Sequence, residues 1–138
     1  MRLIVYNIRY GTGNGPAFHL PLPGAGYLRS SRRVLDDITR FIHDEDPDLV
    51  GLIEVDIGSL RTGLINQAEY IAQHLGHYTA HECKYGQSSL STQLPILRKQ
   101  GNAILAAPRV KGERFHYFPT GIKRLVIELE LDGVCIFL

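Results

Sequence analysis

The chain has 138 residues, 44% of them hydrophobic and 21% charged, which is the balance of a globular domain large enough to bury a core. Its formal net charge of +1 excludes the broad basic surface of proteins that coat nucleic acid, although a local phosphate pocket is compatible with it. No apolar run comes near the roughly 20 residues that a membrane-spanning helix needs.

The two cysteines, Cys83 and Cys135, lie in separate strand-like runs without paired spacing. This pattern indicates small buried apolar residues in a reducing compartment rather than a disulfide. Met1 and Arg2 lead directly into a strand, so no signal peptide is expected. Together these features predict a cytoplasmic protein.

Strand and helix signals alternate along the chain, which predicts an α/β fold. An apolar run over residues 2–9 predicts the first strand, and residues 11–27 are so rich in Gly and Pro that they favour a long loop with a role in substrate selection. Ser30 or Ser31 is then expected to cap a helix that ends before Pro47. Its apolar positions recur at the helical period and are expected to face the sheet: Val34, Leu35, Ile38, Phe41 and Ile42.

A strand and a second helix come next. The run from Leu49 to Ile53 is apolar on both faces, which predicts a strand inside a sheet that is covered on both sides. Residues 65–75 predict an amphipathic helix that Gly76 ends. Three residues are expected on its exposed face: Gln67, Glu69 and Gln73.

The last part of the chain predicts strands joined by loops. The expected strands cover residues 77–83, 103–107, 115–118, 122–131 and 134–138. Asp132 and Gly133 are typical of a two-residue type I′ turn between the last two. Residues 84–99 form a polar stretch that is expected to border the substrate.

Polar side chains stand at the ends of the first two predicted strands. Asn7 follows the first apolar run and Glu54 follows the second. Ligands in layered α/β folds gather at such strand ends, and carboxylate and amide oxygens suit a hard cation such as Mg²⁺. The pattern leaves a second interpretation open, in which Asn7 only bonds the backbone of the following turn and Glu54 pairs with a nearby arginine.

Three short motifs follow one another in the order found in a known family. Residues 6–11 (YNIRYG), 47–56 (PDLVGLIEVD) and 101–105 (GNAIL) resemble the first three motifs of the endonuclease/exonuclease/phosphatase superfamily, which includes deoxyribonucleases, inositol polyphosphate phosphatases and neutral sphingomyelinases. Ile53 departs from the pattern, since a Gln usually precedes the Glu. Residues 58–76 also resemble the helix that follows the metal-ligand strand in this family.

The resemblance implies a fold and an activity. The fold would be an α/β four-layer sandwich of two packed sheets, mixed and antiparallel, with flanking helices. The activity would be metal-dependent hydrolysis of a phosphoester, with Glu54 and Asn7 as catalytic residues and as ligands of Mg²⁺, or of Mn²⁺ as the alternative ion. The substrate would be a nucleic acid, an inositol phosphate or a phospholipid head group.

Three further residues are expected to bind substrate. Arg9 and Arg124 match basic residues of many family members and are suited to hold a phosphate, and Asn102 of the third motif is grouped with them. The alternatives are a surface salt bridge for Arg9, a cross-strand ion pair for Arg124, and tight packing or orientation of a site loop for Asn102. Asp56 is expected either to act beside Glu54 or only to cap the next turn.

The later motifs of the family have no counterpart in the sequence. Members usually supply a His after a central strand, a Gly-Asp-apolar-Asn motif and a final Ser/Thr-Asp-His motif. Residues 1–138 are therefore expected to be the N-terminal part of a single domain, about half of the fold, and to be inactive alone. A partner chain or a missing C-terminal half would complete the sheet near residues 134–138. The alternative function is a non-catalytic fragment that binds phosphate or a partner.

Overall fold

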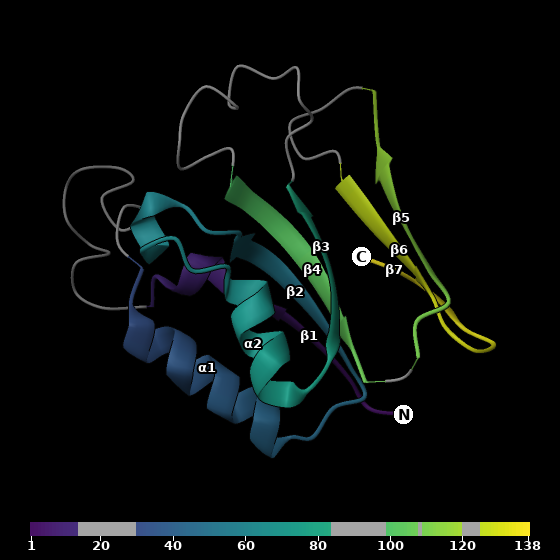
Figure 1. Cartoon of the computed structure of the whole chain (residues 1–138), viewed down its shortest axis with the longest axis horizontal. Helices are drawn as coiled ribbons and strands as arrows, with labels where there is room; N and C mark the ends of the chain where they lie inside the picture. Colours follow the sequence, from purple (N-terminus) through teal and green to yellow (C-terminus); the bar gives the residue numbers. More distant parts are fainter. Residues whose placement is uncertain (14–29, 84–98, 108, 120–124) are drawn as a thin grey trace.

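Two β-sheets and two α-helices make up the described part of the molecule (Figure 1). The computed structural model describes residues 1–13, 30–83, 99–107, 109–119 and 125–138. The first sheet has the strand order β1-β2-β4-β3 and the second the order β5-β6-β7. Along the chain the elements are β1 (Leu3–Asn7), η1 (Arg9–Gly11), α1 (Arg32–Asp44), β2 (Leu49–Asp56), η4 (Leu60–Thr62), α2 (Gln67–Leu75), β3 (Tyr78–Cys83), β4 (Gln100–Ala106), β5 (Gly112–Tyr117), β6 (Leu125–Glu130) and β7 (Cys135–Phe137).

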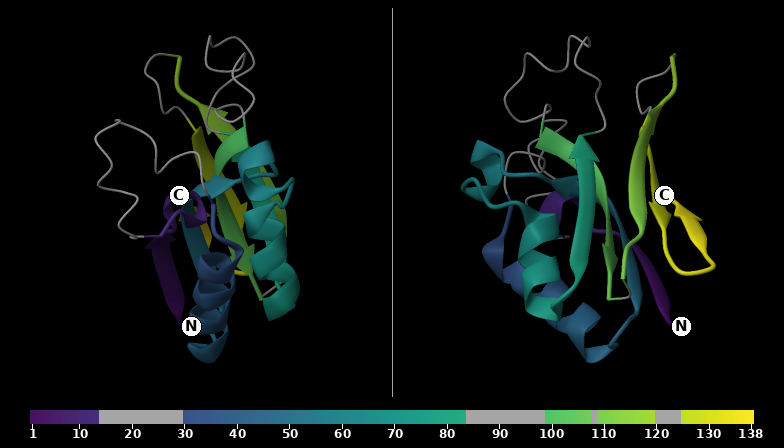
Figure 2. Two further views of the ribbon diagram at one scale, coloured as in Figure 1. Left: turned by 90° about the vertical axis from the view of Figure 1, so that its left-hand side faces the viewer. Right: turned by 45° about the vertical axis from the view of Figure 1, so that its right-hand side comes forward.

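The elements stack as helices, first sheet and second sheet (Figure 2). Within the first sheet β1 and β2 are parallel, and all other strand pairs are antiparallel. One buried cluster joins α1 and α2 to the first sheet, through residues such as Ile42, Ile71 and Leu52. A second cluster joins the two sheets, through residues such as Ile104, Ile127 and Leu129. The predicted fold class, α/β with two packed mixed and antiparallel sheets and flanking helices, is confirmed.

The first helix begins and ends close to the predicted points. Ser31 is its N-cap, and the Ser31 side chain accepts a hydrogen bond from the Val34 N–H. Leu35, Ile38 and Ile42 are buried as expected, but the prediction for Phe41 is wrong, because its side chain is 51% exposed. Phe41 lines a groove of about 450 Å³ along β1, so its face of α1 extends past the edge of the described sheet.

The second helix starts later than predicted. Asn66 is the N-cap, with its side chain accepting from the N–H groups of Ala68 and Glu69, and Gly76 ends the helix in the left-handed conformation. The expectation that Gln67 is exposed is wrong, since this side chain is fully buried. At the first position of a helix the side chain points back toward the preceding loop, so the helical period says little about its burial.

Two details of the last strands also differ from the predictions. The Leu131 N–H donates to the Val134 carbonyl across the predicted turn, but only Gly133 of its two central residues has a positive φ. The turn is therefore not of type I′, which needs a positive φ at both positions. Cys135 is exposed rather than buried, and both cysteines are free thiols.

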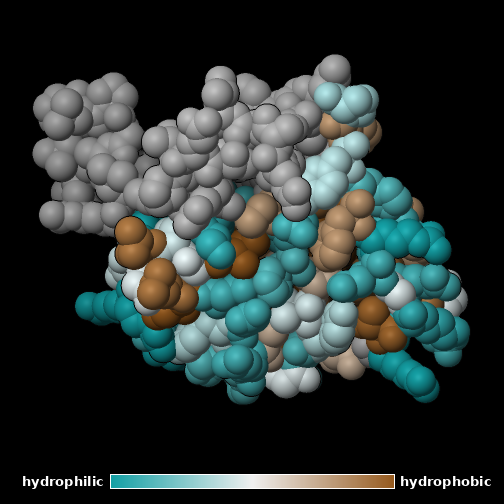
Figure 3. All heavy atoms as spheres, turned by 45° about the horizontal axis from the view of Figure 1, so that its top comes forward, coloured by the Kyte–Doolittle hydropathy of each residue, from teal (hydrophilic) through white to brown (hydrophobic). Residues whose placement is uncertain are grey.

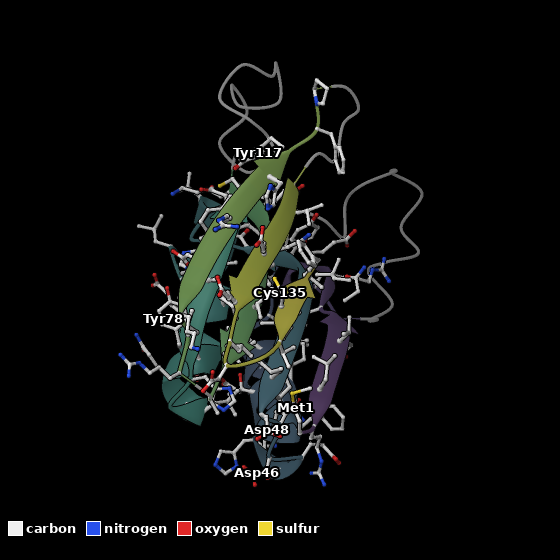
Figure 4. All side chains as sticks on the ribbon, turned by 90° about the vertical axis from the view of Figure 1, so that its right-hand side faces the viewer. Met1, Asp46, Asp48, Tyr78, Tyr117 and Cys135 are labelled. Atoms are coloured by element: carbon white, nitrogen blue, oxygen red, sulfur yellow. The ribbon has the colours of Figure 1, made fainter. Side chains whose placement is uncertain are left out.

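One side of the sandwich carries two open sheet edges. β1 and β7 are edge strands of their sheets and lie on the same side of the molecule (Figure 4). Large apolar side chains are exposed there: Leu3 and Val5 on β1, and Val134 and Phe137 at β7. Apolar edge strands of this kind are unusual in an isolated domain, because free backbone groups and apolar surface invite pairing. None of the described helices is long and apolar enough to cross a membrane.

Candidate functional site

A row of polar residues crosses the first sheet at the carboxyl ends of β1 and β2. Asn7 is in register with Ile53, Ile53 with Asn102, and Asn102 with Glu82. Residues in register share a face of the sheet. Because Ala80 and Ile104 of the same alternation belong to the core between the sheets, this row faces the second sheet. The structure thus brings Asn7 and Asn102 to one end of the sheet, and it adds Glu82, which the sequence reasoning missed.

This end of the molecule is opposite the N-terminus. Met1, Asp46 and Asp48 lie at one end of the sandwich and Tyr117 of β5 lies at the other, to which β1 and β2 run (Figure 4). Figure 3 turns this end halfway toward the viewer, and the described surface in that view is mainly hydrophilic with separate hydrophobic patches. Strand ends are the usual setting of a binding site in layered α/β folds.

Glu54 sits on a β-bulge beside this row. The ladder between β2 and β4 shifts register between Ile53 and Val55, and Glu54 has a φ of 58°. Val50 and Leu52 face the helices, so regular alternation would direct Glu54 into that core. Val55 occupies the helix-facing core position instead. The bulge therefore keeps the carboxylate out of the core, at the cost of a backbone conformation that is rare for a residue other than glycine.

Asn102 is bonded to the bulge. Its Oδ1 accepts a hydrogen bond from the Glu54 N–H at 3.3 Å, which replaces the ladder bond that a bulged residue loses. A Cβ at the neighbouring Gly101 would lie 2.4 Å from the Glu82 carbonyl oxygen and 2.5 Å from Ile57 Cδ1. The structure thus explains two residues of the third motif. Gly101 permits the close approach of β3, and Asn102 fixes the Glu54 backbone.

Asn7 also orients the turn that follows it. Its Oδ1 accepts the Arg9 N–H at 3.0 Å, and Arg9, Tyr10 and Gly11 all have positive φ values of 46°, 59° and 64°. The open alternative for Asn7, a bond to the following turn, is therefore realised. An amide oxygen has a second lone pair, so this bond leaves Asn7 able to contact a cation as well.

Of the two arginines expected to bind phosphate, the structure describes Arg9 but not Arg124. Arg9 is exposed and lines the groove between β1 and α1. Arg124 lies outside the described residues, as do most of the Gly/Pro-rich segment and of the polar stretch that were expected to border the substrate. The roles of both arginines in substrate binding remain predictions.

Asp56 is fully buried and holds the loop after β2. Its carboxylate accepts from the Ser59 N–H and Ser59 Oγ at 2.6 Å each, and from Arg61 Nη2 at 2.7 Å. The Arg61 guanidinium also lies 4.4 Å from the centre of the Tyr10 ring, whose hydroxyl donates to Gln100 Oε1. Asp56 is thus a structural residue that caps the turn, and Arg61 and Tyr10 are supporting residues that the sequence reasoning did not assign.

Tyr117 of the second sheet approaches the same end. Its hydroxyl donates to the Cys83 carbonyl at 3.3 Å. Burial, together with the nearby Glu82 and Cys83, raises the pKa of Tyr117 to about 12. The phenol therefore stays protonated at neutral pH and acts as a donor.

The residues present fit part of a metal site. Glu54 and Asn7 offer a carboxylate and an amide oxygen at one sheet end, which suits Mg²⁺ that retains several water ligands. In the part of the chain that the structure describes, no three His, Cys, Asp or Glu side chains gather to hold a metal ion.

Comparisons with known proteins place this fold. No family model and no curated protein matches the sequence. The 3′ phosphatase NExo from Neisseria, bound to a product DNA hairpin, matches with a TM-score of 0.56 and 16% identity over 99% of this chain and 40% of its own. An endonuclease/exonuclease/phosphatase from Beutenbergia cavernae gives a TM-score of 0.58 and 18% identity over 95% of this chain and 34% of its own. ANGEL2, a 2′,3′-cyclic phosphatase, matches with a TM-score of 0.55 and 16% identity over 98% of this chain and 39% of its own.

These similarities concern the fold. The chain has the fold of the endonuclease/exonuclease/phosphatase structures, as the three motifs predicted. It spans 34% to 40% of the length of these three proteins. Two of the three are phosphatases by name.

Proposed function

We propose that residues 1–138 are the N-terminal part of a single domain that hydrolyses phosphoesters with a bound metal ion. One observation carries the proposal: a strained bulge keeps Glu54 out of the core at the sheet end where Asn7 lies. Strain of this kind is kept where surrounding structure enforces it, and it clusters at functional sites. The shared fold with solved phosphatases supports the same assignment.

Glu54 and Asn7 would hold Mg²⁺, with Mn²⁺ as the alternative. When bound, such an ion polarises a phosphoryl oxygen and offsets the charge that develops as water attacks. Glu54 supplies negative charge to bind the ion, and Asn7 presents its amide oxygen while fixing the following turn. Arg9, together with Arg124, would bind the phosphate anion, and Asn102 would act on Glu54 through the backbone bond described above.

The substrate class is a phosphoester, which we propose to be a nucleic acid, an inositol phosphate or a phospholipid head group. The DNA hairpin bound to NExo favours nucleic acid among the three. The two free cysteines agree with a reducing compartment, so the cytoplasm is the proposed location.

A partner or a further stretch of chain would complete the fold at β1 and β7. The solved proteins are more than twice as long as the portion that this chain matches in them, and the two open edges carry exposed apolar side chains. The same edges favour a second candidate function, in which the chain is a non-catalytic module that binds another polypeptide by strand addition.

The central test replaces Glu54 by glutamine in the natural full-length polypeptide. Glu54→Gln keeps the size of the side chain and removes its charge, so the kcat for bis(4-nitrophenyl) phosphate with Mg²⁺ is expected to fall at least about a hundredfold. The Tm should stay nearly unchanged. Glu130→Gln on the exposed end of β6 is the matched control and should leave the rate intact. Unaltered turnover in Glu54→Gln would reject the site.

The 138-residue chain alone tests whether a further part of the fold is needed for hydrolysis. We expect no Mg²⁺-dependent hydrolysis of the same substrate, together with self-association through the open edges that grows with protein concentration. Sedimentation velocity and the hydrolysis assay measure both. A stable monomer that hydrolyses the substrate would show that no further part of the fold is needed.

A further inference from the structure

Gln67 is a buried polar side chain with every amide group in use. It is the first residue of α2 and has no solvent exposure. Its Oε1 accepts the Asp56 N–H at 2.9 Å, and its Nε2 donates to the Tyr10 carbonyl at 2.8 Å and to Ser30 Oγ at 3.3 Å. A buried amide without such partners would be strongly unfavourable, so the position is suited to this side chain.

The two main partners of Gln67 belong to the two segments that carry the candidate ligands. Asp56 follows Glu54 by two residues on β2, and Tyr10 follows Asn7 by three residues in the left-handed turn. A Cβ at Gly11 would lie 2.7 Å from Gln67 Nε2, so the turn packs directly against the amide. One side chain therefore spans both halves of the site.

Other contacts also join this turn to β2 and to the loop after it. The Ile8 N–H donates to the Ile53 carbonyl at 3.0 Å, and the Arg61 guanidinium stacks on Tyr10. Only an amide of this length combines an acceptor for one segment with a donor for the other. At this position a glutamate would lack the N–H donor, and a methionine would lack both the donor and the acceptor. An asparagine would be too short to reach both segments.

We infer that Gln67 is a positioning residue, which fixes the turn at Asn7 relative to the bulge at Glu54 and thereby sets how the two oxygen ligands face one cation. The presence of the ion rests on the proposed function, whereas the positioning of the two segments rests on the hydrogen bonds of Gln67. Residues that orient metal ligands typically change metal affinity about 10- to 100-fold when they are replaced.

The experiment compares three variants of the natural full-length polypeptide. Gln67→Met removes both hydrogen-bonding groups, and Gln67→Glu keeps the acceptor for Asp56 while removing the donor to Tyr10. Thr39→Val is the matched control, since Thr39 is a buried polar residue of α1 whose hydroxyl bonds only the Leu35 carbonyl of its own helix. Free Mn²⁺ is counted by electron paramagnetic resonance, and backbone exchange of residues 3–12 and 49–56 is followed by hydrogen–deuterium mass spectrometry.

In Gln67→Met we expect Mn²⁺ affinity to fall about tenfold or more, with faster exchange in both segments. In Gln67→Glu the faster exchange should be confined to residues 3–12. Thr39→Val should lower stability without changing Mn²⁺ affinity. Equal Mn²⁺ affinity in Gln67→Met and Thr39→Val, with no selective exchange, would overturn the inference.

Failure of the proposed function gives a different result. If the unaltered chain binds no Mn²⁺, or if Glu54→Gln binds it equally well, the metal assignment fails. The exchange of the two segments still decides whether Gln67 holds them together, because that readout does not depend on the ion.

Discussion

Two arginine–carboxylate pairs in this molecule lie in opposite environments. Arg61 and Asp56, at the site end of the first sheet, are 2.7 Å apart and both side chains are 0% exposed. Arg114 and Glu128, on the second sheet, are 3.1 Å apart, and the Arg114 side chain is 69% exposed. Arg61 donates to Asp56 from both Nε and Nη2, whereas Arg114 donates to Glu128 from Nη1. The Glu128 side chain is 12% exposed, so the two pairs differ most in the exposure of the arginine.

The comparison teaches what each pair contributes. A buried pair pays a large desolvation cost, which is recovered only when every oxygen and N–H has a partner. Asp56 meets this condition through Ser59 and Arg61 together. Such a pair adds little net stability over an apolar core, but neither partner can be removed alone. At the site end the buried pair ties the loop after β2 to Asp56, whereas an exposed pair contributes little to stability.

The largest expected effect is therefore that of Arg61→Met. Removing this guanidinium leaves the Asp56 carboxylate buried without a counter-charge and removes the stacking on Tyr10, so the free energy of unfolding should fall by about 3–5 kcal/mol. Arg114→Met is the matched control and should cost about 1 kcal/mol or less. Urea denaturation of both variants measures the difference.

A double variant sharpens the interpretation. Asp56→Leu combined with Arg61→Met removes the uncompensated charge and should recover part of the stability that Arg61→Met loses. Equal losses in Arg61→Met and Arg114→Met would show that burial does not separate the two pairs.

A smaller loss of stability is expected when a glycine of the first sheet, Gly101, is replaced by alanine. Gly101→Ala places a methyl group against the Glu82 carbonyl, a backbone atom that cannot move cheaply, so we expect a loss of about 1–3 kcal/mol. Gly112→Ala in β5 is the control, because its nearest atom, Glu130 Oε2, would lie 3.7 Å away in ordinary contact. The free energy of unfolding from urea denaturation distinguishes the two, and a Gly101→Ala as stable as Gly112→Ala would contradict the close approach of β3.

Much of the fold was predictable because it follows from local patterns. Each predicted strand and helix is present in the structure, Ser31 caps the first helix, and Gly76 ends the second. The placement of Asn7 and Glu54 at one sheet end was also predictable, since consecutive strands that are apolar on both faces tend to run parallel and to end together.

The parts that failed depend on contacts between distant residues. The bulge at Glu54 gives a glutamate a positive φ, which no propensity favours and which is stabilised by Asn102 from another strand. Gln67 is buried because its partners, Asp56 and Tyr10, are 11 and 57 residues away in sequence. The sequence does show a glutamine at the start of a helix that follows a strand ending in an acid. Its burial could have been predicted only by asking which groups its amide would hydrogen-bond.

The smallest expected effect concerns the pKa of Glu128 in the exposed pair. The hydrogen bond from His116, whose Nε2 lies 2.5 Å from Glu128 Oε2, lowers this pKa, and the charge of Arg114 lowers it further, while burial opposes both. Because the folded pKa lies below the ordinary value of 4.5, the stabilisation is present above pH 4.5 and is lost as the pH falls through the lowered pKa.

His116→Leu removes the hydrogen bond, which is the largest cause, and should raise the pKa of Glu128 toward its ordinary value, measured by carboxyl ¹³C chemical shifts during an acid titration. Arg61→Met should leave this pKa unchanged wherever the variant stays folded, because the two pairs lie in different sheets. A Glu128 titration that moves with Arg61 rather than with His116 would mean that the buried and the exposed pair are electrostatically coupled through the sandwich, and the contrast between them would then no longer rest on burial alone.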